Sequence, residues 1–303
     1  MPVGVAVSDI VADYRGRLEQ AAALPVEALE LQPELDTWQP YPLGRAFRFL
    51  AVHAPSQGRD IASPDDEHRA FAVSEVKRGM EFAHVVGADA YLIHPGQVFA
   101  RENIAGIAVA EGYAYLEDYY WRNPAERSRR ADVLEASLRE LASFHGRRGF
   151  TFDICLENLP FPDLGATFAE YARLYERLAA VSPLLLTLDV PHAFVSWRKL
   201  LRHPRLAAAV EGYPAAHASF YGDLRAWLGA FGGAVRYYHV YGATTEREHL
   251  PVDPRQDYAE DELDLGRVLP LLGREKPVIV EVFGYPTATL LASARQVEAL
   301  RGI

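Results

Sequence analysis

Short apolar runs recur along the whole chain, and longer amphipathic segments separate them. The runs are Val3–Val7, Val26–Leu31, Phe47–His53, Ala88–His94, Phe150–Glu157, Leu184–Asp189, Val235–Val240 and Pro277–Val282. Runs that stay apolar without alternation are typical of strands buried on both faces, as in a parallel sheet. Eight such runs with helical segments between them predict an α/β protein, a (β/α)8 TIM barrel, in a single domain of residues 1–303.

Local motifs predict where several of the helices begin and end. Ser63–Asp66 combines a capping residue, a proline and two acids, which predicts a helix from there to Val86, closed by Gly87. Thr167–Glu170 has the pattern of a capping box for a helix that reaches about Val181. Further segments predicted to be helical are Ala125–Arg147, Pro286–Leu300 and most of His192–Ala234.

An open doubly wound sheet is the structural alternative to the barrel. A sheet of that kind that binds a dinucleotide carries a glycine-rich turn, G-x-G-x-x-G, after its first strand. The first predicted strand is followed instead by S-D-I-V-A-D. The barrel is therefore the favoured architecture.

Composition and charge indicate which kinds of molecule the protein is expected to bind. The net charge is −10, from 31 basic and 41 acidic residues, which disfavours general nucleic-acid binding because that needs a basic face. The N-terminus lacks a secretory signal, and no apolar run approaches the ~20 residues of a membrane span. We expect a soluble, cytoplasmic protein that acts on a small molecule. The single cysteine, Cys155, excludes an internal disulfide and is expected to be a packing residue.

Imidazole or carboxylate groups stand at the end of six consecutive predicted strands or just after it. They are His53, His94, Glu157, Asp189, His192, His239, His249 and Glu281. Because the carboxyl ends of barrel strands line one mouth, these groups are expected to converge. One such histidine alone is more often a hydrogen-bonding residue than a ligand, but charges gathered among apolar residues are costly unless they are paired or bind a cation. The set therefore predicts a centre for zinc, manganese or iron.

This ordered set resembles the xylose isomerase-like TIM-barrel superfamily (AP endonuclease family 2), which includes endonuclease IV and many sugar isomerases and epimerases. The resemblance extends from His53 to Glu281. Both branches share a core that here corresponds to Glu157, Asp189, His192, His239 and Glu281. Endonuclease IV-like phosphodiesterases add histidines in H-A-P and H-P-G motifs and an Asp-x-His, and this chain has His53-Ala54-Pro55, His94-Pro95-Gly96 and His249.

The resemblance implies two or three divalent metal ions per chain. Its implied ligands are His53, His94 and Glu157 for one ion, Glu157, Asp189, His239 and Glu281 for a second, and His192 and His249 for a third. Arg247 stands where the family pattern has aspartate. Three alternatives stay open: Glu246, Glu248 or Asp253 replaces that aspartate, the third site is absent, or Arg247 contacts an anionic substrate.

Hydrolysis of a phosphate ester is the first functional hypothesis, with Glu157, Glu281 and Arg247 as catalytic residues. The resemblance extends to the cobamide-remodelling phosphodiesterases, whose substrate is a corrinoid. The aromatic-rich segment Gln97–Arg122 follows the His94 strand, so it is expected to cover the barrel mouth, either as a substrate-facing lid or as a packed insertion. The expected substrate contacts are Tyr113, Tyr115, Tyr119, Tyr120, Trp121 and Tyr241.

A divalent-metal-dependent sugar isomerase or epimerase is the second hypothesis. In that chemistry Glu157 and Glu281 act as acid and base, and His192 stabilises the enediolate. This hypothesis assigns no role to His53, His94 or His249. A barrel that keeps these ligands but only binds a small molecule is a third alternative, and the sequence leaves the oligomeric state open.

Overall fold

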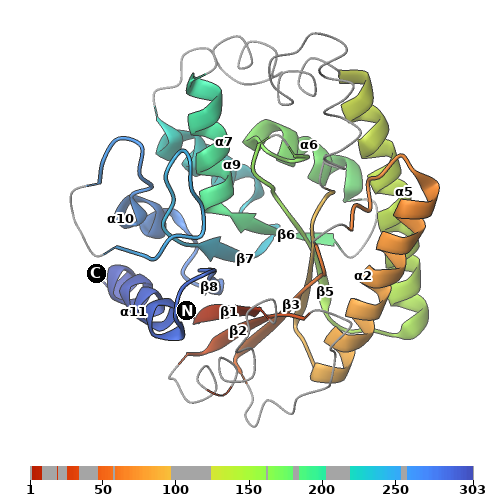
Figure 1. Ribbon diagram of the computed structural model, residues 1–303, viewed down its shortest axis with the longest axis horizontal. Helices are drawn as coiled ribbons and strands as arrows, with labels where there is room; N and C mark the ends of the chain where they lie inside the picture. The colour runs from red at the N-terminus through yellow and green to blue at the C-terminus, as the bar shows by residue number, and fades with distance from the viewer. Residues whose placement is uncertain are drawn as a thin grey trace.

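Eight parallel strands close into a barrel in chain order, with β1 hydrogen-bonded to β8 (Figure 1). This computed structural model describes residues 2–8, 19, 26–33, 47–56, 59–96, 124–161, 163–179, 184–202, 219–253 and 258–302. The strands are β1 Val3–Ser8, β2 Ala28–Gln32, β3 Phe49–His53, β4 Ala90–Ile93, β5 Asp153–Glu157, β6 Leu184–Asp189, β7 Val235–Val240 and β8 Val278–Val280. The predicted (β/α)8 barrel is confirmed.

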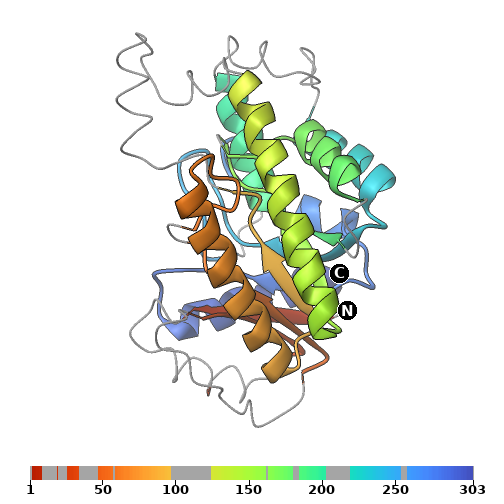
Figure 2. The same cartoon turned by 90° about the vertical axis from the view of Figure 1, so that its right-hand side faces the viewer.

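Helices surround the barrel, and the described ones are α2 Asp66–Val86, α5 Pro124–Arg148, α6 Phe168–Leu178, α7 Val190–Arg202, α9 Phe220–Phe231, α10 Leu265–Val268 and α11 Thr287–Gly302. A 3-10 turn, Leu269–Leu271, follows α10. In both ribbon views α2 and α5 lie side by side, outside β3 and β4 (Figures 1 and 2). Within the described ranges, no helix is both long and apolar enough to cross a membrane.

The start of α2 differs from the prediction. The carboxylate of Asp65 caps the helix by accepting the His68 N–H at 2.8 Å, whereas Ser63 Oγ accepts the Asp65 N–H in the turn before it. The helix therefore begins at Asp66, and Ser63 and Pro64 belong to the preceding turn. Gly87 closes α2 in the left-handed conformation, at φ 71°, as predicted.

The other predicted helix boundaries agree closely with the structure. Thr167 Oγ1 accepts the Glu170 N–H at 3.1 Å, so this cap of α6 is confirmed. Described α6 ends at Leu178, and residues 180–183 lie outside the described residues. Helices α7 and α9 confirm the helical character of the segment after β6, of which residues 203–218 lie outside the described part.

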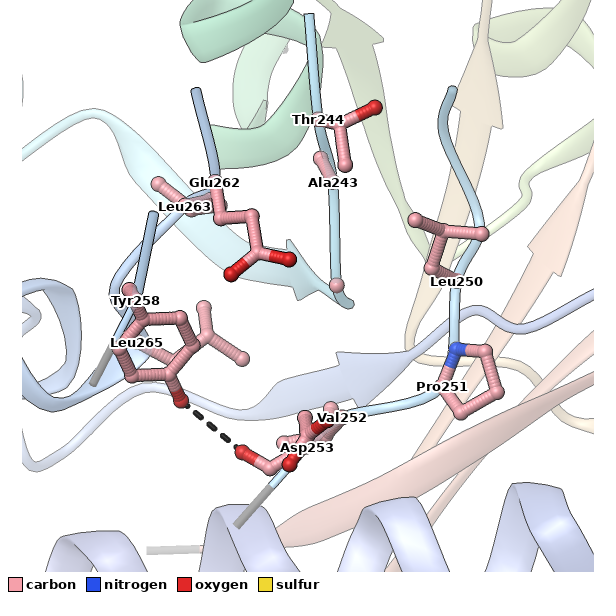
Figure 3. Close-up of a pocket in the computed structure, with 11 residues that line it drawn as sticks. Ala243, Thr244, Leu250, Pro251, Val252, Asp253, Tyr258, Glu262, Leu263 and Leu265 are labelled. Carbon is pink, nitrogen blue, oxygen red and sulfur yellow. Dashed lines mark hydrogen bonds between the residues drawn. The ribbon is translucent and has the colours of Figure 1, made fainter. Parts of the chain in front are cut away.

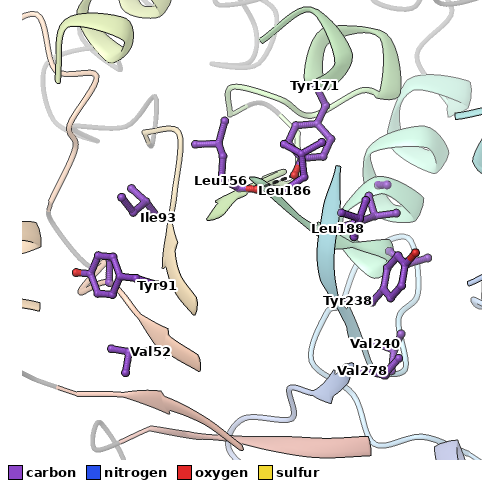
Figure 4. Packing of buried hydrophobic residues seen from close by; sticks show 14 of the residues in the cluster. Val52, Tyr91, Ile93, Leu156, Tyr171, Leu186, Leu188, Tyr238, Val240 and Val278 are labelled. Carbon is purple, nitrogen blue, oxygen red and sulfur yellow. Dashed lines mark hydrogen bonds between the residues drawn. The ribbon is translucent and has the colours of Figure 1, made fainter. Parts of the chain in front are cut away.

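Side chains alternate between the two faces of the barrel wall. Outward side chains join the main core together with side chains of the helices, and Figure 4 shows Val52, Tyr91, Ile93, Leu156 and Leu188 among them. The inward cluster is rich in small residues: Ala6, Ala28, Ala51, Ala90 and Cys155. Cys155 is fully buried, as expected of a packing residue. Small inward side chains leave room in the barrel for larger polar groups at the mouth.

Candidate metal centre

The carboxyl ends of β3 to β8, with the loops that follow them, bring together all eight strand-end groups that the sequence singled out. They lie in three groups whose candidate ligand atoms are within 4.8 Å of one another. The first cluster is His53, His94 and Glu157; the second cluster is Glu157, Asp189, His239 and Glu281; the third cluster is His192, Glu248 and His249. Glu157 belongs to both the first and the second cluster.

Glu157 ends β5, and its two carboxylate oxygens face different clusters. Oε1 lies 3.0 Å from His239 Nδ1, whereas Oε2 lies 3.0 Å from His94 Nε2 and 3.7 Å from His53 Nε2. Burial by itself raises the pKa of Glu157, but the charge of His239 and the close imidazoles of His239, His53 and His94 outweigh it and hold that pKa well below its usual range. The buried carboxylate is therefore ionised and lies between two sets of imidazoles.

Buried polar atoms in the first cluster lack ordinary partners. Glu157 Oε2 and His94 Nδ1 have no well-aligned hydrogen bond to the part of the chain that is described. The imidazole rings of His53 and His94 meet edge to face, with centroids 4.7 Å apart. A cation between these groups would satisfy Oε2 and offset the cost of its burial. The donor set of imidazole and carboxylate is consistent with divalent metal binding.

Backbone carbonyls fix the tautomers of three histidines. A carbonyl only accepts, so a ring nitrogen in contact with one carries the hydrogen, and the other nitrogen keeps its lone pair. Nδ1 donates in each case: His53 to Ala54 O at 2.6 Å, His192 to Asn158 O at 3.0 Å, and His249 to Glu281 O at 3.1 Å. In the neutral form of each ring, Nε2 therefore carries the lone pair that a metal ligand needs.

Asn158, the residue after Glu157, makes two hydrogen bonds to the backbone at the end of β6. Its Oδ1 accepts the Asp189 N–H and its Nδ2 donates to the Asp189 carbonyl, both at 2.8 Å. Through its own carbonyl it also orients His192. Sequence reasoning missed this role, although a polar residue directly after a ligand at a strand end was the available signal.

Comparison with known proteins decides the family. The sequence profile of the xylose isomerase-like TIM barrel matches residues 45–301. The chain belongs to this family. No curated protein sequence gives a significant match. Family membership and the three clusters together identify a metal-dependent enzyme class.

Solved structures with the same fold cover nearly the whole chain. A D-tagatose 3-epimerase-like protein is 16% identical, with a TM-score of 0.65, covering 99% of this chain and 97% of its own. Endonuclease IV from Thermus thermophilus is 20% identical, with a TM-score of 0.62 and coverages of 99% and 98%. Another protein from Thermus thermophilus, soaked with zinc chloride, is 20% identical, with a TM-score of 0.61 and coverages of 100% and 98%. At these identities the likeness establishes the fold.

The third cluster differs from the family pattern, which has an aspartate at the position of Arg247. Glu248 completes it, with Oε2 at 3.4 Å from His192 Nε2. Glu246 is exposed and pairs with Arg202, and the Arg247 guanidinium turns to the Tyr285 hydroxyl at 3.4 Å. Of the three substitutes considered from sequence, the structure thus places Glu248 beside the two histidines.

Charge and backbone geometry mark the third cluster as unusual. Burial lowers the pKa of His192, but Asp189 and Glu248 outweigh it and raise that pKa to about 10. His249 has φ 54°, the only positive value of a non-glycine residue in the described chain. Left-handed backbone at such a residue costs on the order of 1–3 kcal/mol and is concentrated at functional sites.

Tyr241 is buried and contacts both the second and the third cluster. Its hydroxyl donates to Asp189 Oδ2 at 2.9 Å, and its ring stacks on His249 with centroids 4.3 Å apart. Its substrate contact stays a prediction. The other aromatic residues expected at the substrate, Tyr113, Tyr115, Tyr119, Tyr120 and Trp121, lie in 97–122, outside the described residues.

Two polar residues of β2, Glu30 and Gln32, reach the second cluster although sequence reasoning did not single them out. Glu30 Oε2 lies 3.0 Å from His239 Nε2, and Gln32 Nε2 donates to Glu281 Oε1. The available signal was their spacing, because positions two apart on a strand point to the same face.

A separate cavity of about 400 Å³ lies beyond β7 (Figure 3). Its walls are two chain segments, 242–244 and 250–253, together with Tyr258, Glu262, Leu263 and Leu265. It contains no residue of the three clusters. The candidate chemistry of this family member therefore belongs to the strand ends and not to this cavity.

Proposed function

We propose that the chain is a metal-dependent hydrolase of phosphate esters, a phosphodiesterase. The observation that carries this proposal is the position of Glu157, shared by two clusters that each have further ligands of their own. A hydrolase with adjoining metal ions gives roles to His53 and His94, which a single-metal centre leaves unused. Bound divalent ions of this kind supply a water that is nucleophilic at neutral pH and stabilise charge on phosphoryl oxygens.

Three residues of this chain would have separate roles in the hydrolase. Glu157, ionised and buried, joins the first and second clusters and fixes their separation. Glu281 completes the second cluster, where burial raises its pKa but His239 outweighs this and lowers it to about 2, so the carboxylate stays charged. Arg247 is exposed next to Tyr285, where its guanidinium can contact the anionic group of a substrate.

A cobamide is the candidate substrate within this proposal. The support is the sequence I-V-E-V-F-G around Glu281 and the aromatic segment 97–122. A broad, flat and partly apolar corrinoid suits a segment rich in Tyr with a Trp, because aromatic rings bury large apolar area. Release of the nucleotide loop from a purified cobamide, followed by chromatography, tests this choice.

A sugar isomerase or epimerase is the second candidate, and the comparisons favour it over the hydrolase. Several of the similar solved structures are sugar epimerases or an epimerase-like protein. In this reaction the second cluster suffices: Glu157 and Glu281 move a proton at carbon, and His192 donates to the substrate oxygen. The first cluster would then have no necessary part.

Paired variants separate the two candidates. Glu157→Gln removes the carboxylate that both reactions need, whereas the double variant His53→Ala, His94→Ala removes the first cluster alone. In the hydrolase, the double variant loses roughly 100-fold or more of its activity on bis(p-nitrophenyl) phosphate, since even indirect disruption of a metal site costs about 10–100-fold. Retained hydrolysis in the double variant would contradict the proposal.

An epimerase gives the opposite result in the same experiment. Turnover of a ketohexose would then survive in the double variant and disappear in Glu157→Gln. The matched control is Glu140→Gln, an exposed carboxylate of α5 that pairs with Lys77, which should behave as the parent chain in both assays. Elemental analysis of the parent chain adds an independent criterion: two or more metal ions favour the hydrolase, and one favours the epimerase.

A further inference from the structure

Strand β2 places a buried carboxylate behind the second cluster. Leu29 and Leu31 point outward into the main core, whereas Ala28 belongs to the inward cluster of the barrel. Glu30 shares the inward face with Ala28 and is fully buried. It is not a member of any metal-ligand group among the described residues. Its position in the barrel interior therefore calls for an explanation other than direct ligation.

Every oxygen of Glu30 has a donor close by. Oε2 accepts from the Tyr237 hydroxyl at 2.7 Å and lies 3.0 Å from His239 Nε2. Oε1 accepts from Gln32 Nε2 at 3.3 Å. The same Gln32 amide also donates to Glu281, so the partners of Glu30 join two members of the second cluster. Such full satisfaction offsets the cost of burying a carboxyl group.

The contact with His239 sets the direction of that ring. With Nε2 turned to Glu30, the opposite atom Nδ1 faces the cluster, 3.0 Å from Glu157 Oε1 and 3.3 Å from Glu281 Oε2. Three other histidines of the centre donate to backbone carbonyls, whereas His239 has a carboxylate at the equivalent place. A carboxylate acceptor fixes ring orientation, as a carbonyl does, and in addition raises the basicity of a metal-binding imidazole.

We propose that Glu30 is a positioning residue, which holds His239 Nδ1 toward the second cluster and strengthens this imidazole as a ligand for a divalent cation. Because it is buried on the side of His239 that faces away from the cluster, Glu30 acts on the cation through this ring and, by way of Gln32, through Glu281, without being a ligand itself. The role rests on the metal centre and is independent of whether the reaction is hydrolysis or epimerisation.

Cobalt titration of the metal-free protein tests this role without an activity assay. His239→Ala first identifies which part of the visible Co²⁺ absorption belongs to the second cluster, because that part disappears. Glu30→Gln, which keeps the shape but removes the charge, is expected to weaken the same Co²⁺ ion by about 10–100-fold in a titration against a competing chelator. The other bound ions should keep the parent affinity.

A matched control separates positioning from general loss of stability. Glu75 is a buried carboxylate of α2 that pairs with Arg59 and Arg78 and belongs to none of the three clusters. Glu75→Gln should lower the melting temperature but leave all Co²⁺ affinities unchanged. Glu30→Gln with parent affinity for the second-cluster ion would overturn the role of Glu30 while leaving the proposed function intact. Loss of hydrolysis alone would not bear on it.

Two milder variants cover the case in which Glu30→Gln does not fold. Tyr237→Phe removes one hydrogen bond to Glu30, leaves the carboxylate in place and is expected to weaken the second-cluster ion roughly two- to tenfold, as loss of one hydrogen bond implies. Gln32→Met removes the hydrogen bonds to both Glu30 and Glu281, so its effect should be at least as large. Parent affinity in both variants would overturn the proposal, and a parent chain that binds no Co²⁺ would overturn the metal centre and this role together.

Discussion

Asp189 at the end of β6 lies beside His239 on β7, and a shift in strand register makes them neighbours. Leu186 pairs with Val235, but the next residue, Thr187, pairs with Tyr237, so one residue of β7 is skipped. Without the shift, Asp189 would lie beside Tyr238. Irregularities of this kind re-aim side chains next to active sites, and here the shift aligns two members of the second cluster.

Metal removal should destabilise the fold. Ions that bind only the folded chain stabilise it, by about 2.7 kcal/mol at a hundred times the Kd, and chelation removes that contribution and leaves ionised Glu157 buried without a cation. We expect EDTA treatment and dialysis to lower the Tm in calorimetry by several degrees, and Zn²⁺ or Mn²⁺ to restore it. An unchanged Tm after verified metal loss would argue against a buried centre.

Glu248 should decide the occupancy of the third cluster. Glu248→Ala removes its only carboxylate, so elemental analysis is expected to show one metal ion fewer per chain than in the parent. Glu246→Ala is the control, because the exposed Glu246 pairs with Arg202. Equal metal content in the parent and in Glu248→Ala would rule out this ligand.

Metal binding at the third cluster should depend on pH. The pKa of His192 is about 10 in the metal-free protein, so its ring carries a proton at pH 7 that a metal must displace. The sign follows directly: affinity falls as pH falls. We expect the affinity for the ion that Glu248→Ala removes to rise about tenfold per pH unit between pH 6 and 8. Affinity that is flat over this range would contradict the assignment.

Gly96 of the H-P-G motif should be intolerant of any side chain. Its φ is 111°, and a Cβ there would lie 2.5 Å from Ala62 Cβ and 2.6 Å from Asp60 Oδ1. Gly96→Ala therefore combines backbone strain with a clash in the loop that carries His94. We expect a loss of roughly 2 kcal/mol or more in urea unfolding, together with weaker metal binding at the first cluster.

Gly87→Ala is the matched control for Gly96→Ala. Gly87 also has positive φ, 71°, but nothing lies within 4 Å of the Cβ it would gain. Its substitution should cost only about 1–2 kcal/mol of left-handed strain and leave metal content unchanged. If both variants unfold at the same urea concentration and keep full metal content, the crowded packing around Gly96 affects neither stability nor metal binding.

The strand-end ligands could be predicted from sequence because their pattern is local. A run such as Leu184–Asp189 shows its apolar stretch and its polar end within six residues, and the structure gives the same bounds. Barrel closure then places all such ends at one mouth, whatever the loops do. For the same reason the groups around Glu157 were predictable as one centre.

The contacts of Glu30 and Glu248, and the position of Asp189 beside His239, could be recognised only in the tertiary structure. Glu30 and His239 are 209 residues apart, and their contact exists only because β2 and β7 face each other across the closed barrel. Glu248 lies beside His192, whereas Glu246 is exposed and pairs with Arg202, and nothing in the local sequence distinguishes these two glutamates. Sequence alone thus determined the fold and which strand ends carry candidate ligands, since both follow from the order of apolar runs and their polar ends. The structure decided which groups meet, because barrel closure and strand register act between distant segments.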